Sequence, residues 1–160
     1  MSETVARSLI ETEIQPAWHW VRAIRQQVAE ALSDYSPELR TAAMITASEL
    51  VENAVKYGDG VIAAPTIRIS VSICGDGMCI RVINGSTNRA AVEGLLTRVQ
   101  EIRGTPDKEA LYLGRLQQLV ACPGESGKLG LYRMAFEGRF ELTGTYEDGI
   151  VTMTATRRTP

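Results

Sequence analysis

Apolar residues recur at three- and four-residue spacing in two segments near the start of the chain, and this spacing predicts helices. In the first segment, from Ala17 to about Tyr35, the recurring residues are Trp18, Val21, Ile24, Val28, Ala31 and Leu32. The second segment begins at Ser36 and Pro37, a cap and first-turn signature, and continues to about Tyr57. We therefore expect two consecutive helices.

Alternating apolar and polar residues predict two hairpins farther along the chain. The expected strands are 66–73, 78–83, 139–145 and 150–156. Turns at 74–77 and 147–149 join these strands in pairs. Two antiparallel pairs are the expected result.

Helical spacing returns between the hairpins, interrupted by glycine and proline. The expected helices are 91–102, 108–120 and 129–136, with a turn at 84–87 and a glycine-rich loop at 122–130. The complete order predicts an α+β two-layer sandwich, in which helices cover one face of a mixed, mostly antiparallel sheet.

The composition is that of an ordinary globular domain. The chain has 160 residues, which suits a single domain over 1–160, and 44% of them are hydrophobic. The net charge of -2 leaves no basic excess for the phosphates of nucleic acid. No apolar run is long enough for a membrane span or a secretory signal. We expect a cytoplasmic protein that binds neither nucleic acid nor membrane.

The cysteines and the single histidine argue against two kinds of site. Cys74, Cys79 and Cys122 lack the paired spacing of a zinc site, so we expect reduced cysteines in the core. His19 lies between two tryptophans and is expected to pack beside the core, which leaves no phosphoacceptor histidine motif.

Three different polar groups share one face of the second helix. Glu49, Asn53 and Lys56 have i, i+4, i+7 spacing and fall within about 60° of one another on a helical wheel. The opposite, apolar face consists of Ala43, Ala47, Leu50, Val51, Ala54 and Val55. The helix can therefore bury one face while it presents a carboxylate, an amide and an ammonium group together.

These three groups suit phosphoryl transfer. The Asn53 amide oxygen is a ligand type for Mg²⁺, the Glu49 carboxylate can accept a proton from an attacking hydroxyl, and Lys56 can meet a phosphate oxygen. The spacing alone favours a plainer interpretation, a solvated helix face on which Glu52 and Lys56 form an i, i+4 pair.

The segment ELVENAVKYG, residues 49–58, closely resembles the N-box of the GHKL superfamily, which contains gyrase, heat-shock chaperone, histidine kinase and MutL ATPases. The resemblance implies ATP and Mg²⁺ as cofactors, Asn53 as the Mg²⁺ ligand, and Glu49 as the catalytic base known from anti-sigma serine kinases. The similarity extends from about Leu32 to the C-terminus. Its parts are the N-box 47–58, a first glycine turn 82–87, a lid 104–127 and a second glycine loop 126–131.

Both glycine segments depart from the family pattern. Residues 82–87, ValIleAsnGlySerThr, lack the aspartate that reads adenine in the family, so Asn84 is either the adenine reader, beside Gly85, or simply a turn residue. Residues 126–131 keep Gly130 and Leu131 but place Lys128 where a glycine is usual, and Lys128 is either a phosphate contact or a solvated charge. Both departures resemble the SiaB-type protein kinases.

The resemblance implies an ATP-dependent serine/threonine kinase that phosphorylates a STAS-domain antagonist in a bacterial partner-switching pathway. A sigma factor or a phosphatase would be further partners, and the assembly would be a homodimer. The implied site consists of catalytic Glu49 and ATP-binding Asn53, Lys56, Asn84, Gly85, Lys128, Gly130 and Leu131. The alternatives are a binding module that keeps the fold but has lost ATP, and a subunit of a larger signalling enzyme.

Overall fold

The computed structural model describes residues 6–59, 64–121 and 129–159. Five strands of these residues form one sheet in the order β1-β2-β3-β5-β4, and all neighbouring strands are antiparallel. The strands are β1 Arg7–Ile14, β2 Ile67–Cys74, β3 Gly77–Gly85, β4 Glu141–Glu147 and β5 Ile150–Arg158. The α+β class is therefore confirmed, whereas the expected mixed sheet was wrong for the described strands, since none of them pairs in parallel.

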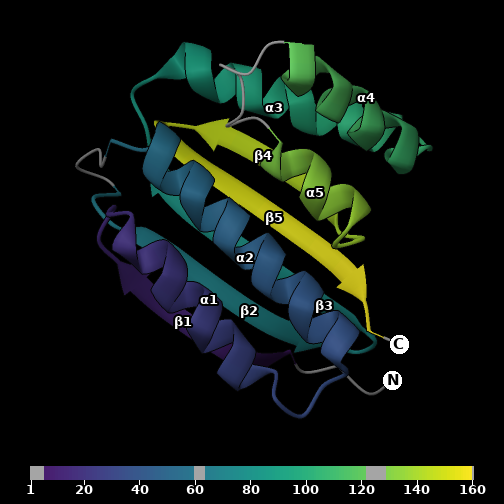
Figure 1. Ribbon diagram of the computed structural model, residues 1–160. Coiled ribbons are helices and arrows are strands. Elements are labelled where there is room, and N and C mark those ends of the chain that lie inside the picture. Colours follow the sequence, from purple (N-terminus) through teal and green to yellow (C-terminus); the bar gives the residue numbers. More distant parts are fainter. Residues whose placement is uncertain (1–5, 60–63, 122–128, 160) are drawn as a thin grey trace, which may run out of the picture.

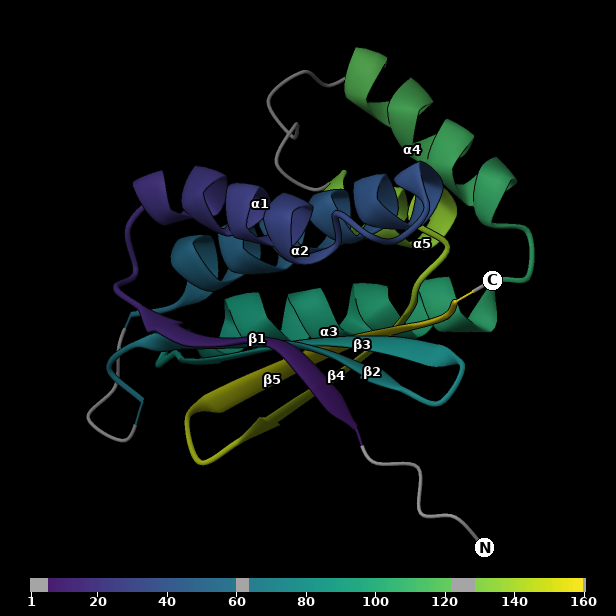
Figure 2. The same cartoon turned by 90° about the horizontal axis from the view of Figure 1, so that it is seen from below.

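The helices cover one face of this sheet, as predicted (Figures 1 and 2). They are α1 His19–Ala31, α2 Pro37–Tyr57, α3 Arg89–Gly104, α4 Lys108–Ala121 and α5 Gly130–Phe136. α1 packs against α2, and α3 packs against the edge strand β4. α4 lies farther from the sheet and contacts α5, so it adds an outer helix to the two expected layers (Figure 2).

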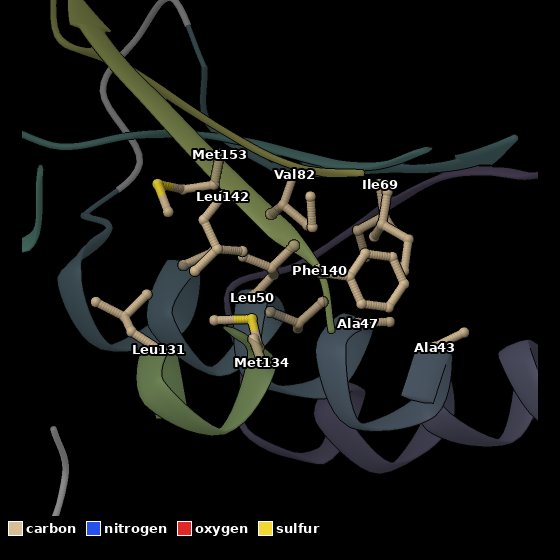
Figure 3. Close-up of a cluster of buried hydrophobic side chains, with 14 of the residues drawn as sticks. Ala43, Ala47, Leu50, Ile69, Val82, Leu131, Met134, Phe140, Leu142 and Met153 are labelled. Atoms are coloured by element: carbon tan, nitrogen blue, oxygen red, sulfur yellow. The ribbon is translucent and has the colours of Figure 1, made fainter. Parts of the chain in front are cut away.

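The core lies between the sheet and the layer formed by α2 and α5 (Figure 3). Small residues of α2, among them Ala43 and Ala47, let this helix approach the sheet closely, while Leu50 and Met134 fill the space beside it. The sheet contributes the buried side chains of Ile69, Val82, Leu142 and Met153. The polar stripe of α2 therefore stands on a helix whose opposite face is fixed by packing.

Local signals placed α2 and the hairpins correctly. The Ser36 hydroxyl accepts a hydrogen bond from Leu39 N at 3.2 Å, and Pro37 occupies the first turn, as the cap signature predicted. The two hairpins β2–β3 and β4–β5 are confirmed by their antiparallel registers.

Strand β1 was not among the expected elements. It pairs with β2, and its one fully buried side chain, Ile14, faces the core, while Glu11 and Glu13 are exposed. A register shift between Ser8 and Ile10 interrupts its alternation, so the period-2 pattern of this segment is short. Charged residues on this edge strand also protect it against pairing with another chain.

Two predicted boundaries were wrong. Asn84 and Gly85 belong to β3 rather than to a turn, because they continue the ladder opposite Val151 and Ile150. The last hairpin begins at Glu141 instead of residue 139. Arg139 has a left-handed φ of 54° at the end of α5, which takes it out of the extended conformation.

Candidate functional site

The polar stripe of α2 lines an open cleft of about 360 Å³. Its lining residues are Trp18, Glu49, Glu52, Asn53, Lys56, Leu129, Gly130 and Arg133. The cleft thus combines the start of α1, the outer face of α2 and the start of α5. The structure brings together four of the residues expected at the site, namely Glu49, Asn53, Lys56 and Gly130.

Glu49 is largely buried in the cleft, with only 16% of its side chain exposed. Burial and the neighbouring Glu52 carboxyl raise its pKa, and the guanidinium groups of Arg133 and Arg25 only partly oppose this effect. Arg133 Nη1 lies 3.4 Å from Glu49 Oε1. A raised pKa makes the ionised carboxylate a stronger base, which suits the acceptance of a proton.

Gly130 makes room for the Glu49 carboxylate. A β-carbon on Gly130 would collide with Glu49 Oε2. The absence of a side chain at residue 130 therefore lets the start of α5 lie directly against the carboxyl group.

Asn53 presents an amide that the described residues do not fully satisfy. Its Nδ2 atom is buried and has no hydrogen-bond partner among them. An unmet buried donor of this kind typically costs about 1–3 kcal/mol. The amide oxygen of the same group is a ligand type that suits Mg²⁺.

The cleft residues are of types that could hold the phosphate and metal end of Mg·ATP. Besides Asn53, Lys56 supplies a positive charge at the cleft, with its Nζ 5.3 Å from the Tyr57 ring centroid. No group of three or more His, Cys, Asp or Glu side chains able to hold a metal occurs in the described part of the chain. Mg²⁺ does not require such a group when substrate phosphates and waters complete its coordination.

Asn84 and Gly85 do not line this cleft. The Asn84 side chain faces α2, is only 5% exposed, and lies beneath Gly58, where a β-carbon would come within 2.8 Å of its Nδ2 atom. Asn84 Nδ2 donates to Gly85 O at 3.4 Å. Asn84 is therefore largely covered among the described residues.

The remaining expected site residues lie in the core or outside the described residues. Leu131 packs in the hydrophobic core (Figure 3). Lys128 falls outside the described residues, together with the rest of the first half of the second glycine loop, 126–128. Residues 104–121 of the expected lid form the end of α3, a short connection and α4, and its remaining residues are not described.

Three residues near the end of α2 were missed by sequence reasoning. Asp59 accepts hydrogen bonds from the backbone N and the hydroxyl of Thr87, and these bonds lower the pKa of its carboxyl group. Ser86 donates from its hydroxyl to Tyr57 O at 2.6 Å. These contacts attach the C-terminal end of α2 to the end of β3, at the segment where the family aspartate was expected.

Arg133 was also missed, because its role depends on its contact with Glu49, which is distant in sequence. The only signal was its position three residues after Gly130, which places it one helical turn farther along α5. Local patterns do not reveal which side chain of another helix it meets.

Several aromatic and sulfur side chains are more exposed than expected. Trp18 is 57% exposed and lines the cleft, and His19 is exposed at the start of α1 rather than packed beside the core. The reason is that both lie at the very start of α1, before the buried positions Ile24 and Val28. Cys74 is exposed and Cys79 is half-buried on the hairpin β2–β3, while Cys122 is not described.

None of the described helices combines the length and the apolar character needed to cross a membrane. In comparisons with known proteins, no family model and no curated protein sequence matches this chain. The cleft residues and the N-box resemblance are therefore the features that point to a function.

Proposed function

We propose that this chain is a GHKL-type, ATP-dependent serine/threonine protein kinase that phosphorylates a STAS-domain antagonist in a partner-switching pathway. The observation that carries the proposal is the convergence of Glu49, Asn53 and Lys56 with Gly130 on one cleft. The N-box resemblance assigns a role to each of the first three residues. The α+β fold class, with helices on one face of the sheet, supports the proposal at that coarse level, while the described strands pair antiparallel and not in the mixed sheet that was expected.

In this proposal the cleft residues have separate roles in binding the nucleotide and in accepting the proton. Asn53 and Lys56 hold the metal and phosphate end of the nucleotide, whose γ-phosphate is the group to be transferred. Glu49 takes the proton from the acceptor serine or threonine hydroxyl. Its raised pKa makes the ionised carboxylate a stronger base for this proton, which passes to solvent after the transfer. Catalysis then consists chiefly of positioning and charge stabilisation.

The second candidate function is a binding module that has lost ATP. One observation favours it: Asn84, the expected adenine reader, is buried beneath Gly58. Such a protein would bind its partner through the same fold without phosphorylating it.

Titration calorimetry with ATP, in the presence and absence of Mg²⁺, separates these two functions. The kinase proposal expects Mg²⁺-dependent binding by the wild type and its loss in Asn53→Ala, which lacks the amide. A melting experiment is an independent check, since a ligand at 100 times its Kd adds about 2.7 kcal/mol of stability. A wild type that binds no nucleotide at millimolar concentration would refute the kinase proposal and favour the binding module.

A further inference from the structure

Arg133 connects two carboxylates with two different edges of its guanidinium group. Its Nη1 donates to Glu49 Oε1 and its Nε donates to Glu137 Oε2, each at 3.4 Å. The Arg133 side chain is 38% exposed and lines the cleft together with Glu49. One guanidinium therefore links the proposed base on α2 to the C-terminal end of α5.

The second carboxylate oxygen of Glu137 contacts helix α4. The Tyr112 hydroxyl of α4 donates to Glu137 Oε1 at 3.0 Å, and the Tyr112 ring lies 5.3 Å from the ring of Phe136. Burial and the nearby Glu137 raise the pKa of Tyr112, so its hydroxyl remains a donor. The contacts form a continuous chain from Glu49 through Arg133 and Glu137 to Tyr112.

We infer that Arg133 is a positioning residue for Glu49: its guanidinium holds the carboxylate at Oε1, while Gly130 leaves room for Oε2, and the two together set the orientation in which Glu49 meets the acceptor hydroxyl. Glu137 and Tyr112 hold the guanidinium in this orientation. The inference rests on the proposed kinase function, and it assigns a role that the N-box resemblance does not contain.

The geometry favours positioning of Glu49 over direct contact with a phosphate. The two Arg133 nitrogens that the structure shows as donors, Nη1 and Nε, both point to carboxylates, and these two bonds fix the plane of the guanidinium. This pair of hydrogen bonds to two carboxylates is also specific to arginine. A planar guanidinium bonds to two separate acceptors in fixed directions, whereas lysine supplies a single point charge.

The charge of Arg133 supports the same role. Burial and the neighbouring Glu52 carboxyl both disfavour the ionised form of Glu49. The guanidinium opposes them at the oxygen it contacts, so it helps to keep the carboxylate ready to accept a proton.

The test compares Arg133→Met and Arg133→Lys with wild type, with kcat and KM for the acceptor protein measured separately from the Kd for Mg·ATP. We expect Arg133→Met to lower kcat by about 10²-fold, the effect of a small misplacement of a catalytic group, with an unchanged Kd. Arg133→Lys should recover part of kcat. Arg68→Met is the matched control, because Arg68 also forms a 3.4 Å ion pair, with Glu13, but on an exposed part of the open sheet face.

A double variant shows whether Arg133 acts through Glu49. Glu49→Gln combined with Arg133→Met should have the same kcat as Glu49→Gln alone, because the positioned group is already absent. If the double variant instead has a kcat reduced by the product of the two single-variant reductions, the inference is overturned. An Arg133→Met variant with normal kcat, or one that only weakens Mg·ATP binding, would also overturn it. A wild type without transfer activity would instead refute the proposed kinase and this inference together.

Discussion

Gly130 and Glu49 are in contact across two helices, and the contact depends on the missing side chain of the glycine. A β-carbon at residue 130 would occupy the place of Glu49 Oε2. The second glycine segment, which differs from the family pattern at Lys128, therefore still contains a glycine with a defined steric role. That role concerns the carboxylate of the proposed base.

Gly130→Ala should impair transfer more than stability. The obstructing atom is the end of a side chain, so the Glu49 carboxylate must swing aside while the backbone stays in place. We expect kcat to fall by about 10²-fold, with a change in the free energy of unfolding below about 1 kcal/mol. Steady-state kinetics and urea unfolding measure the two quantities.

Gly94→Ala is the control for this substitution. Gly94 lies within helix α3, and no atom lies within 4 Å of its added β-carbon. We expect unchanged transfer and a gain in stability of about 0.5–1 kcal/mol. Equal kinetics for the two alanine variants would contradict the steric role of Gly130.

Glu49→Gln should stabilise the protein at neutral pH. The pKa of Glu49 is raised in the folded state by burial and by Glu52, so the folded protein binds this proton more tightly than the unfolded chain. The wild type therefore loses stability as the pH rises from the ordinary glutamate range, about 4, through the folded-state pKa. Glutamine does not ionise and avoids this loss.

Urea unfolding of Glu49→Gln and wild type at about pH 4 and pH 7 measures this effect. The two proteins should be nearly equal at the lower pH, and the variant should be the more stable at the higher pH. A variant less stable than wild type at neutral pH would show that the ion pair with Arg133 outweighs the burial of the carboxylate.

Ser86→Ala should loosen the attachment of α2 to β3. The buried Ser86 hydroxyl donates to Tyr57 O at 2.6 Å and accepts from Asn88 N at 3.2 Å. Its removal leaves both backbone groups without this partner, at an expected cost of about 1–3 kcal/mol in unfolding free energy.

Thermal unfolding checks the Ser86→Ala prediction against Thr97→Ala. Thr97 also bonds a backbone carbonyl, that of Glu93, but at an exposed position of α3. The control should change stability by no more than about 0.5 kcal/mol. A Ser86→Ala variant as stable as the control would show that this attachment contributes little.

Local signals were sufficient for most of the fold. The Ser36 cap, the apolar spacing of α2 and the turns of both hairpins each depend on residues close in sequence, and they placed these elements correctly. Strand β1 was missed because its pairing with β2 is long-range and its own alternation is interrupted by the register shift.

The candidate site shows the same difference between local relationships, which the sequence predicts, and long-range contacts, which it does not. Helical spacing placed Glu49, Asn53 and Lys56 on one face, because that relationship lies within a single helix. The burial of Asn84 under Gly58 and the ion pair of Glu49 with Arg133 depend on how separate elements pack. Neither relationship has a local signature in the sequence.

The most direct measurement for the central claim is transfer of the γ-phosphate from Mg·ATP to a STAS-domain acceptor by wild type, Glu49→Gln and Asn53→Ala, alongside their nucleotide affinities. We predict that Asn53→Ala loses nucleotide binding, because it lacks the amide that is proposed to hold the metal. Glu49→Gln should bind Mg·ATP with nearly the affinity of wild type but transfer about 10²- to 10⁴-fold more slowly, the usual contribution of a general base. Transfer at the wild-type rate by Glu49→Gln, or a wild type that neither binds nucleotide nor phosphorylates the acceptor, would contradict the account.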